Sequence, residues 1–461
     1  MKIFRRDFLK KAGTLSVSGF LPFKAFSFEE DIGNPKTDAS DSFLIKDAQV
    51  ISMDPEIGNF GRASVLVENG FIKTISRNVQ IPHDIHVIEG EGAILMPGLI
   101  DNHWHLWTSL LRSMAGNEKE KGYFQMTERF SKLYTPEDMK LAARFAAAEA
   151  INSGITCVND FNHNARSPEF VMASFEGIAE AGLKGRVAYG GYRDLAPDTP
   201  TDFEGIKQVL EITSNNDKYK DIALGLGARS VDSPFLKEDW ERARELGMPI
   251  DIHVNQRGQI EQLYNKGLLD NDVNIIHANK VTDEEIEKIA STGASVTMTP
   301  FTEMRIGFGF PQINRFRKSK VRLGVGVDTT ALSGNANLFA VIKVLQNIAN
   351  AEAKNEFEIL PEEILKMVTT DAAKIQKIQD KTGSITPGKR ADLIMLRKND
   401  LNFSTGNRPY HLMTEAAQPA NIEFVAIGGK IAKRDGELLN IDKDELVMQA
   451  KETFNRFTSQ L

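Results

Sequence analysis

The stretch MPGLIDNHWH at residues 96–105 combines a turn signal, an apolar run and two histidines. The Pro-Gly pair predicts a sharp change of chain direction, and the apolar residues next to it in the sequence predict a buried strand. Residues two apart on a strand point to the same side, so His103 and His105 would direct both imidazoles toward one point, while Trp104 turns into the wall. This is metal-ligand spacing, although such a pair taken alone more often binds no metal.

Seven further apolar runs follow this stretch and alternate with amphipathic helical segments such as residues 136–154 and 282–293. This alternation predicts parallel strands covered by helices. Eight strands favour an α/β fold with a closed (β/α)8 TIM barrel over residues 96–375, whereas an open doubly wound sheet would also give alternating runs. No Gly-x-Gly-x-x-Gly turn follows the first strand, which disfavours a dinucleotide-binding sheet. The predicted strands are AILMPGLIDNHWH (93–105), TCVNDF (156–161), GRVAYGGY (185–192), IALGLGAR (222–229), PIDIHVN (249–255), VNIIHAN (273–279), SVTMTP (295–300) and LGVGVD (323–328).

The two ends of the chain share a different sequence pattern, in which short predicted strands are separated by turn signals. Residues 41–95 and 376–440 both alternate apolar and polar residues around turns and Gly pairs. We expect these segments to join into one small composite β-sandwich attached to the barrel. Residues 441–461 predict a C-terminal helix of unknown purpose.

Length, charge and cysteine content bound the class of protein. A chain of 461 residues with 41% hydrophobic residues can bury a large core. The net charge of −7 and the lack of a basic stripe argue against nucleic acid as a partner and favour a small-molecule substrate. Cys157 is the only cysteine, so an intramolecular disulfide and a thiolate metal cage are both excluded. We expect Cys157 to be a buried packing residue rather than a nucleophile.

The N-terminal segment, residues 1–27, resembles a twin-arginine export signal. Arg5 and Arg6 precede an FLK sequence and a weakly apolar run, and residues 25–27 form a small-x-small cleavage tripeptide. This predicts a periplasmic protein that is exported folded; the alternative is a basic helix that stays in the cytoplasm. No other run reaches the roughly 20 apolar residues of a spanning helix, so we expect no stable membrane insertion after the signal is removed.

Five polar side chains fall at or near the C-terminal ends of predicted strands. In a β/α barrel, this rim is where active sites form. Closure of the barrel would make the first and eighth strands neighbours and bring the eighth-strand aspartate beside the histidine pair. The fifth-strand histidine would reach across the barrel mouth, so the pattern predicts a metal site. The five residues are His103, His105, His253, His277 and Asp328.

These residues, with the motifs around them, resemble the amidohydrolase superfamily, in particular its cytosine-deaminase-like and chlorohydrolase-like branch. The likeness covers nearly everything after residue 41. It implies a β/α barrel with a composite β-sandwich, and a metal-dependent hydrolase in which His103, His105, His253 and Asp328 ligate the metal. The motifs are MPGLIDNHWH (96–105), IDIHVN (250–255), IIHANKVTDEEI (275–286), LGVGVD (323–328) followed by Asn337-Leu338-Phe339, and GSITPGKRADLIML (383–396).

The resemblance also bears on the number and kind of metal ions. Some relatives hold two metals bridged by a carboxylated lysine at the end of the fourth strand. Here that strand ends Gly227-Ala228-Arg229-Ser230, with no lysine, so we expect one divalent ion. Three imidazoles and a carboxylate suit Zn²⁺, while Fe²⁺ or Mn²⁺ would accept the same ligands.

Catalytic roles follow from the same resemblance. Asp328 would act as the base that takes a proton from a metal-activated water. His277 is similar to the residue that contacts this water or the substrate, its alternative being a satisfied barrel histidine. Deaminases of this branch place Glu three residues after the strand-five histidine, but this chain has Gln256, which can hydrogen-bond a substrate but cannot serve as an acid. Glu303, after the seventh strand, is the candidate replacement, or else a solvated loop carboxylate.

Further side chains near the rim are candidates for substrate contacts. Trp104, Trp107 and Tyr123 could form an aromatic wall for a planar substrate, although aromatic residues at a barrel rim more often serve packing. His163 and Asp160, after the second strand, could line the mouth of the barrel or cap the next helix.

Three functions stay open on this basis. The leading one is hydrolysis of a C–N bond, by deamination or by cyclic amide or amidine hydrolysis, in a small cyclic or aromatic compound. The second is a periplasmic amidase or dipeptidase, favoured by Gln256, because an amide leaving group can be protonated by Asp328 alone. The third is a barrel that binds a metal or ligand without turnover, which the intact donor set argues against. A homodimer is expected only by analogy with relatives.

Overall fold

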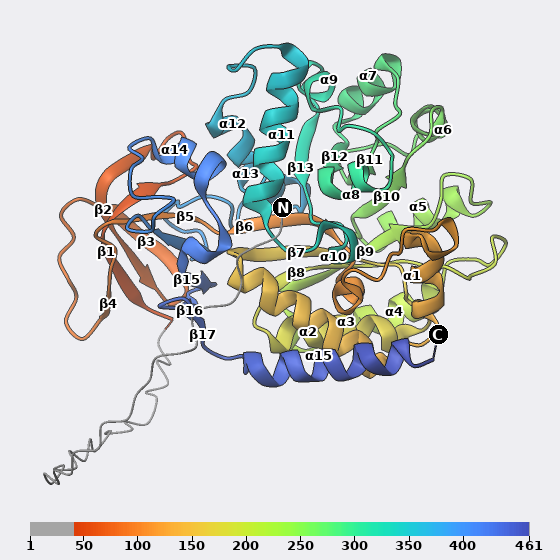
Figure 1. Ribbon diagram of the computed structural model, residues 1–461, viewed down its shortest axis with the longest axis horizontal. Helices are drawn as coiled ribbons and strands as arrows, with labels where there is room; N and C mark the ends of the chain where they lie inside the picture. Colours follow the sequence, from red (N-terminus) through yellow and green to blue (C-terminus); the bar gives the residue numbers. More distant parts are fainter. Residues whose placement is uncertain (1–40, 461) are drawn as a thin grey trace, which may run out of the picture. The chain divides into compact units, whose positions relative to one another are not determined.

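Eight parallel strands make up the central sheet of the protein, of which a computed structural model describes residues 41–460 (Figure 1). The strands succeed one another in sequence order around the sheet, and helical segments join most of them. Each strand overlaps one of the eight predicted runs, which confirms the (β/α)8 barrel. The strands are β6 (Leu99–Trp104), β7 (Ile155–Asn162), β8 (Lys184–Tyr189), β9 (Ile222–Ala228), β10 (Ile250–Val254), β11 (Val273–His277), β12 (Ser295–Met298) and β13 (Arg322–Val325).

The barrel closes where its first and last strands meet, at the level of the predicted site. A parallel bridge joins Trp104 and Asp328. The backbone N–H of His105 donates to the Asp328 carbonyl at 2.6 Å, and the Asp328 N–H donates to the His103 carbonyl at 2.8 Å. Closure therefore brings Asp328 beside the histidine pair, as the order of the strands predicts.

Two residues make this close approach between the strands possible. Gly326 has no side chain, and a Cβ at this position would lie 2.3 Å from the carbonyl oxygen of His103. The buried Asp101 carboxylate spans the seam, because it accepts from the backbone N–H of His103 at 2.9 Å and from that of Val327 at 2.8 Å. The backbone that carries the histidine pair is thus fixed from the eighth strand.

Helices cover the outside of the barrel and begin at sequence signals. α2 (Pro136–Asn152) starts with a capping box formed by Thr135 and Asp138, and α7 (Asp283–Thr292) with one formed by Thr282 and Glu285. Such reciprocal hydrogen bonds satisfy N–H groups that a helix start leaves unpaired. The other helices are α1 (Tyr123–Ser131), α3 (Pro168–Glu180), α4 (Phe203–Ser214), α5 (Leu236–Glu245), α6 (Gln259–Asn265), α8 (Pro300–Arg305), α9 (Ile313–Lys318), α10 (Thr330–Ser333), α11 (Leu338–Ala353), α12 (Pro361–Lys366), α13 (Thr370–Ile375), α14 (Pro409–His411) and α15 (Lys443–Thr458).

Strands from the two ends of the described chain form a second sheet of nine strands with its own hydrophobic core. The N-terminal β5 pairs antiparallel with the C-terminal β14, which joins the two ends. The sheet curls back on itself, since Phe43 of β1 packs against Phe424 of β15 with ring centroids 5.8 Å apart. This arrangement is consistent with the predicted β-sandwich. The strands are β1 (Phe43–Ile51), β2 (Asn59–Glu68), β3 (Phe71–Ser76), β4 (His86–Glu89), β5 (Ala93–Pro97), β14 (Leu393–Arg397), β15 (Ile422–Ile427), β16 (Lys430–Arg434) and β17 (Glu437–Leu438).

The run predicted as the first barrel strand, residues 93–105, is in fact two strands. Its first half is β5 of the second sheet, whereas the barrel begins with β6 at Leu99. Gly98 lies between the two strands, where a Cβ would be 2.1 Å from the Thr156 hydroxyl oxygen. Glycine therefore lets the chain cross from one sheet to the other within a single residue.

The segment predicted as a C-terminal helix contains α15, which lies along α2 (Figure 1). Its Phe457 packs on Tyr134, with 4.6 Å between the ring centroids. The same helix contacts η1 (Leu106–Leu111), the short 3-10 helix that follows β6. The end of the chain thus supports the segment directly behind the histidine pair.

The predicted export signal, residues 1–27, lies outside the described residues. It stays a prediction, and so does the periplasmic location that depends on it. Among residues 41–460, no helix combines the length and the apolar character needed to cross a bilayer.

Candidate active site

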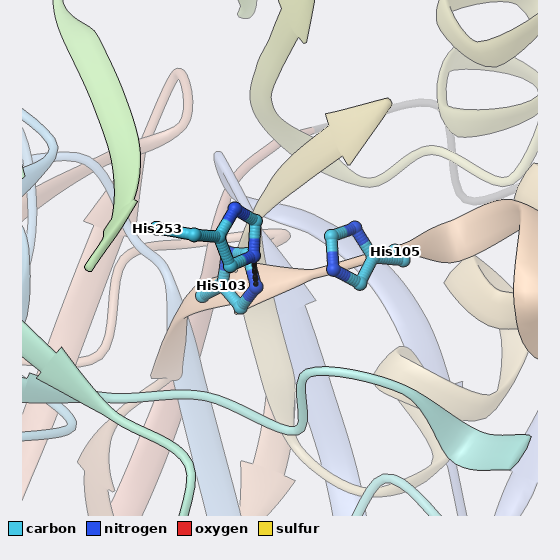
Figure 2. Close-up of side chains that lie close together, drawn as sticks. All are labelled: His103, His105 and His253. Atoms are coloured by element: carbon cyan, nitrogen blue, oxygen red, sulfur yellow. Dashed lines mark hydrogen bonds between the residues drawn. The ribbon is translucent and has the colours of Figure 1, made fainter. Parts of the chain in front are cut away.

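Three histidines converge at the C-terminal rim of the barrel (Figure 2). His103 belongs to β6, His105 follows it directly, and His253 belongs to β10. One ring nitrogen of each lies within 4.8 Å of the other two, and the Nε2 atoms of His103 and His253 are 3.2 Å apart. The structure therefore brings together the predicted ligands from the first and fifth strands.

Asp328, three residues after β13 ends, completes the predicted set. Its Oδ1 lies 3.2 Å from His103 Nε2 and 3.3 Å from His105 Nε2. The backbone φ of Asp328 is 62°, in the left-handed region that non-glycine residues rarely adopt. Strain of this kind, about 1–3 kcal/mol, persists where the surroundings fix the residue, and it clusters at functional sites.

The surroundings leave ring nitrogens of the histidines with free lone pairs. His105 donates from Nδ1 to the Phe161 carbonyl at 2.7 Å, so its Nε2 carries no hydrogen in the neutral ring. Burial lowers the pKa of His103 to about 3 and that of His253 well below its ordinary value. Burial alone would raise the pKa of Asp328, but its contacts with His103 and His105 hold it well below the usual range.

A divalent cation fits this arrangement. The lone pair of His105 Nε2 faces an ionised carboxylate oxygen of Asp328, and two such acceptors repel unless a cation lies between them. Donor atoms about 2.0 to 2.2 Å from one tetrahedral ion lie about 3.3 to 3.6 Å apart. The contacts of 3.2 and 3.3 Å to Asp328 are close to this spacing. Imidazole and carboxylate are also the donors that catalytic zinc sites use.

His277, the last residue of β11, lies beside the four predicted ligands. Its Nδ1 is 3.0 Å from Thr299 Oγ1 and 3.3 Å from Glu303 Oε1. Because a carboxylate can only accept, Nδ1 carries the hydrogen, and Nε2 is left available to a ligand. Burial lowers the pKa of His277, but the contact with Glu303 and the charge of Asp328 outweigh this and raise it above its ordinary value.

Glu303 is fully buried and does not line the cavity in front of this site. Its carboxylate accepts from the Thr299 N–H at 2.8 Å and from the Asn279 amide at 3.3 Å, in addition to the contact with His277. Glu303 therefore lies behind His277 and not in the cavity wall, so the position predicted for it, as an acid facing the substrate, is corrected. Glu303 is a positioning residue that fixes the ring of His277.

We expect Glu303→Gln to lower kcat by about 10- to 100-fold, the usual effect of removing a hydrogen-bond partner behind an active-site group. The amide keeps the volume and can still accept from Thr299, but it lacks the charge that faces His277. Steady-state kinetics together with metal analysis check this, with exposed Glu245→Gln on α5 as control. Unchanged kcat would show that Glu303 does not position His277.

The cavity in front of these residues has a volume of about 510 Å³, a size typical of small-molecule sites. Aromatic rings form much of its wall, which suits a planar substrate. Tyr123, one of the predicted wall residues, lines it. The other aromatic lining residues are Phe124, Phe161, Phe308, Tyr192 and the histidines 105, 163, 253 and 277.

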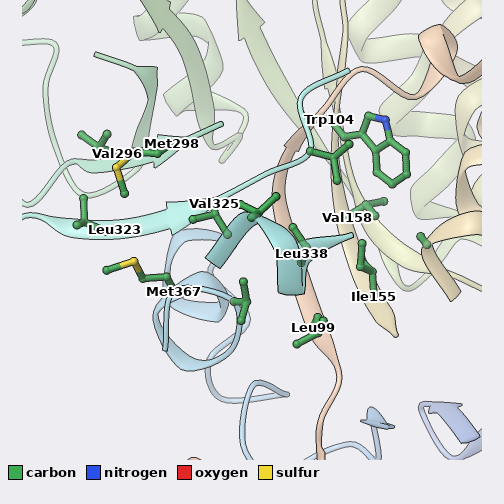
Figure 3. Close-up of a cluster of buried hydrophobic side chains, with 14 of the residues drawn as sticks. Leu99, Trp104, Ile155, Val158, Val296, Met298, Leu323, Val325, Leu338 and Met367 are labelled. Carbon is green, nitrogen blue, oxygen red and sulfur yellow. The ribbon is translucent and has the colours of Figure 1, made fainter. Parts of the chain in front are cut away.

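Trp104 and Trp107 do not line this cavity, so the prediction that they bind substrate is corrected. Trp104 is fully buried among aliphatic side chains such as Val158 (Figure 3). Trp107 lies in η1 and donates its indole N–H to His163 Nδ1 at 2.7 Å. His163 does line the cavity, and its ring stacks on that of His105 with centroids 3.7 Å apart. The two tryptophans therefore pack and position other residues.

Gln256 is exposed and lies outside the cavity, because β10 ends at Val254 and the chain then turns away. Its predicted substrate contact is corrected. Asn255 lines the cavity instead, and its buried Oδ1 has no hydrogen-bond partner among the described residues. Asp160 does not reach the cavity; it is buried and accepts from the Leu106 N–H at 3.0 Å, at the start of η1.

Arg193, Arg229 and Asn255 are among the polar lining residues that received no role from the sequence. Each of them follows a barrel strand at its C-terminal end, in β8, β9 and β10 respectively. Their position directly after barrel strands was the one feature of the sequence that could have marked them as site residues, because such loops build the active sites of β/α barrels.

Cys157 is buried in β7, and burial raises its pKa to about 12, which fits a packing role.

The barrel and the converging donors define the class of a metal-dependent hydrolase. A sequence model of the amidohydrolase family matches residues 94–432, and the chain belongs to this family. Family membership confirms the resemblance seen in the sequence, including hydrolysis of C–N bonds in small molecules and dependence on a metal.

Two relatives named as deaminases are similar to this chain over nearly their whole length. The chain is 26% identical over 430 residues to a 5-methylthioadenosine/S-adenosylhomocysteine deaminase of Caldicellulosiruptor saccharolyticus, covering 88% of this chain and 97% of the relative. It is 27% identical over 442 residues to a 5'-deoxyadenosine deaminase of Methanococcus maripaludis, covering 89% and 98%.

Solved structures show the same fold. An adenosine deaminase from Xanthomonas campestris with bound zinc superimposes with a TM-score of 0.81 at 22% identity, covering 90% of this chain and 98% of that one. Atrazine chlorohydrolase TrzN from Arthrobacter aurescens, complexed with zinc, gives a TM-score of 0.80 at 18% identity, covering 89% and 100%.

Proposed function

We propose that the protein removes the amino group from an aromatic ring by hydrolysis, with one Zn²⁺ held by His103, His105, His253 and Asp328. The main support for this proposal is that imidazole nitrogens and an ionised carboxylate converge beside a cavity lined by aromatic rings. Relatives named as deaminases of adenosine-type compounds support an aminopurine as the substrate class. The zinc-bound neighbours support Zn²⁺.

The site residues can be assigned different roles in such a reaction. When bound, the cation would supply Lewis-acid chemistry, which makes water a nucleophile at neutral pH. Asp328 is ionised because its pKa is held low, so it can take a proton from water and deliver it to the leaving group. His277, fixed by Thr299 and Glu303, offers Nε2 to hold the attacking water or the oxygen that forms on the ring carbon.

Amide hydrolysis is the second candidate, and it is favoured by the small number of acidic side chains in the cavity wall. Among the described residues, Asp232 and Asp328 are the carboxylates that line the cavity, and Gln256 lies outside it. A deamination that needs a second acid beside the ring would depend on Asp232 or on His277. Hydrolysis of a cyclic amide or dipeptide needs only Asp328, because the leaving nitrogen can take the proton that Asp328 removed from water.

A metal-reconstituted activity screen tests both candidates. The protein is stripped with a chelator, reloaded with Zn²⁺, Fe²⁺ or Mn²⁺, and incubated with 5'-methylthioadenosine, 5'-deoxyadenosine, cyclic amides and dipeptides. We expect ammonia release from the aminopurines that is lost on chelation and restored by Zn²⁺. Formation of amine or acid without ammonia would support the amidase, and a metal-loaded protein with no turnover would support the barrel that only binds.

A further inference from the structure

Arg193 is a cation in the cavity wall without an acidic partner. It lies in the loop after β8, is half-buried and lines the cavity. Within residues 41–460, no carboxylate lies within ion-pair distance of its guanidinium; the adjacent Asp194 pairs with Arg166 at 2.8 Å instead. The Nε of Arg193 is buried and has no hydrogen-bond partner among these residues. Leaving a buried donor of this kind unpaired is unfavourable.

The contact between Arg193 and His163 does not satisfy the guanidinium. One terminal nitrogen of Arg193 lies 3.1 Å from His163 Nε2. The other ring nitrogen, Nδ1, accepts from Trp107, whose indole N–H can only donate. A neutral imidazole carries one hydrogen, so this hydrogen must be on Nε2, where it faces the N–H groups of Arg193. Two donors therefore meet, so His163 gives the guanidinium no acceptor.

Arg229 lines the same cavity but is satisfied. Its guanidinium donates to the backbone carbonyls of Thr199 at 2.8 Å, Leu195 at 3.1 Å and Ala196 at 3.0 Å, which holds the loop after β8. Arg193 instead lies over aromatic rings, 5.5 Å from the ring centroid of Tyr123 and 5.4 Å from that of Phe124. These rings hold the guanidinium in place. The Tyr123 hydroxyl accepts a hydrogen bond from Arg193, but this leaves the buried Nε–H without a partner among the described residues and brings no negative charge to the guanidinium.

We propose that Arg193 recognises a carboxylate on the substrate and so determines specificity for anionic compounds. A guanidinium without an acidic partner matches one carboxylate, which accepts two N–H bonds in a fork. His163 lies between Arg193 and the predicted ligand His105, so this carboxylate would sit one ring away from the reacting end of the substrate. The inference deepens the proposed function, because it takes the cavity as the substrate site.

Binding of matched probes to the zinc-loaded full chain tests this without turnover. Benzoate and benzamide have the same shape and differ in charge, and isothermal titration measures the dissociation constant of each. We expect wild type to bind benzoate about tenfold or more tightly than benzamide, as a charge-assisted hydrogen bond provides. Arg193→Gln should remove this preference, Arg193→Lys should restore part of it, and exposed Arg129→Gln on α1 should behave as wild type.

Three results would overturn the proposal. The first is that wild type binds benzoate and benzamide equally well, or binds neither of them measurably. The second is a preference for benzoate that survives in Arg193→Gln, because the carboxylate would then lie on the metal or a histidine. The third is Arg193-dependent binding of phenyl phosphate but not benzoate, which assigns the residue to phosphate. The binding experiment does not depend on turnover, so it can still be interpreted if the activity screen detects no hydrolysis. The carboxylate-recognition proposal and the proposed function can therefore be rejected independently of each other.

Discussion

Asp328→Asn is expected to lower kcat by about 10³-fold, within the range that a general base contributes. The amide has nearly the shape of the carboxylate, so the barrel seam at the His103 and His105 backbone should stay closed. It carries no charge and cannot take a proton from water. Steady-state kinetics at saturating substrate measure the effect, with exposed Asp444→Asn on α15 as the matched control.

Metal analysis of the same variant separates the two roles of Asp328. A variant that keeps its metal and loses turnover shows that the carboxylate acts as the base. A variant that loses both shows that ligation is the larger role, as expected if the ionised oxygen facing His103 and His105 holds the cation. Activity within about tenfold of wild type would remove Asp328 from the mechanism.

Gly326→Ala is expected to lower the free energy of unfolding by about 1–3 kcal/mol, the usual cost of overpacking a tight core. The added Cβ would lie 2.3 Å from the carbonyl oxygen of His103, and this neighbour is backbone that cannot rotate away. The strand that carries the histidine pair must therefore shift, so we also expect weaker metal binding. Thermal unfolding and metal titration measure the two effects.

The matched control for this variant is Gly61→Ala, because a Cβ there meets nothing within 4 Å. It should leave both the unfolding temperature and the metal affinity near those of wild type. If Gly326→Ala unfolded at the same temperature as this control and bound metal equally well, the first and eighth strands would not depend on close contact at Gly326.

The barrel and the donor set could be predicted because they depend on short-range rules. The two-residue period of a strand places His103 and His105 on one side, and the parallel alternation of strands and helices places Asp328 at the seam. These rules need no knowledge of loops. They hold for the three histidines, which lie in a strand or directly after one. They also hold for Asp328, because its backbone pairs with that of His103 and His105 three residues past β13.

Trp104 lies in β6 but faces the aliphatic core. The other failed predictions concern residues beyond the end of a strand whose backbone does not pair with a neighbouring strand. Gln256 is two residues past β10, so the direction of the strand no longer controls its side chain, and it is exposed. Trp107 lies in η1, a 3-10 helix whose residues are all buried. Glu303 lies in the first turn of α8, and the start of this helix at Pro300 turns its carboxylate inward toward His277.

Arg193 could not be singled out from the sequence, because loops have no periodicity and half-buried arginines are common. Its role depends on the hydrogen that Trp107 forces onto the far nitrogen of His163. Trp107 is more than 80 positions away in the sequence, and only coordinates place the two side chains around one ring.

A chain of contacts connects the final helix to the candidate metal site. Phe457 packs on Tyr134, whose hydroxyl donates to the Trp107 carbonyl at 2.7 Å, and Trp107 holds the ring that stacks on His105. A preparation clipped by a protease near residue 440 would keep every donor atom yet lose the outermost member of this chain. Intact mass should therefore be verified before rates from different preparations are compared, and purification tags are better placed away from the carboxyl end.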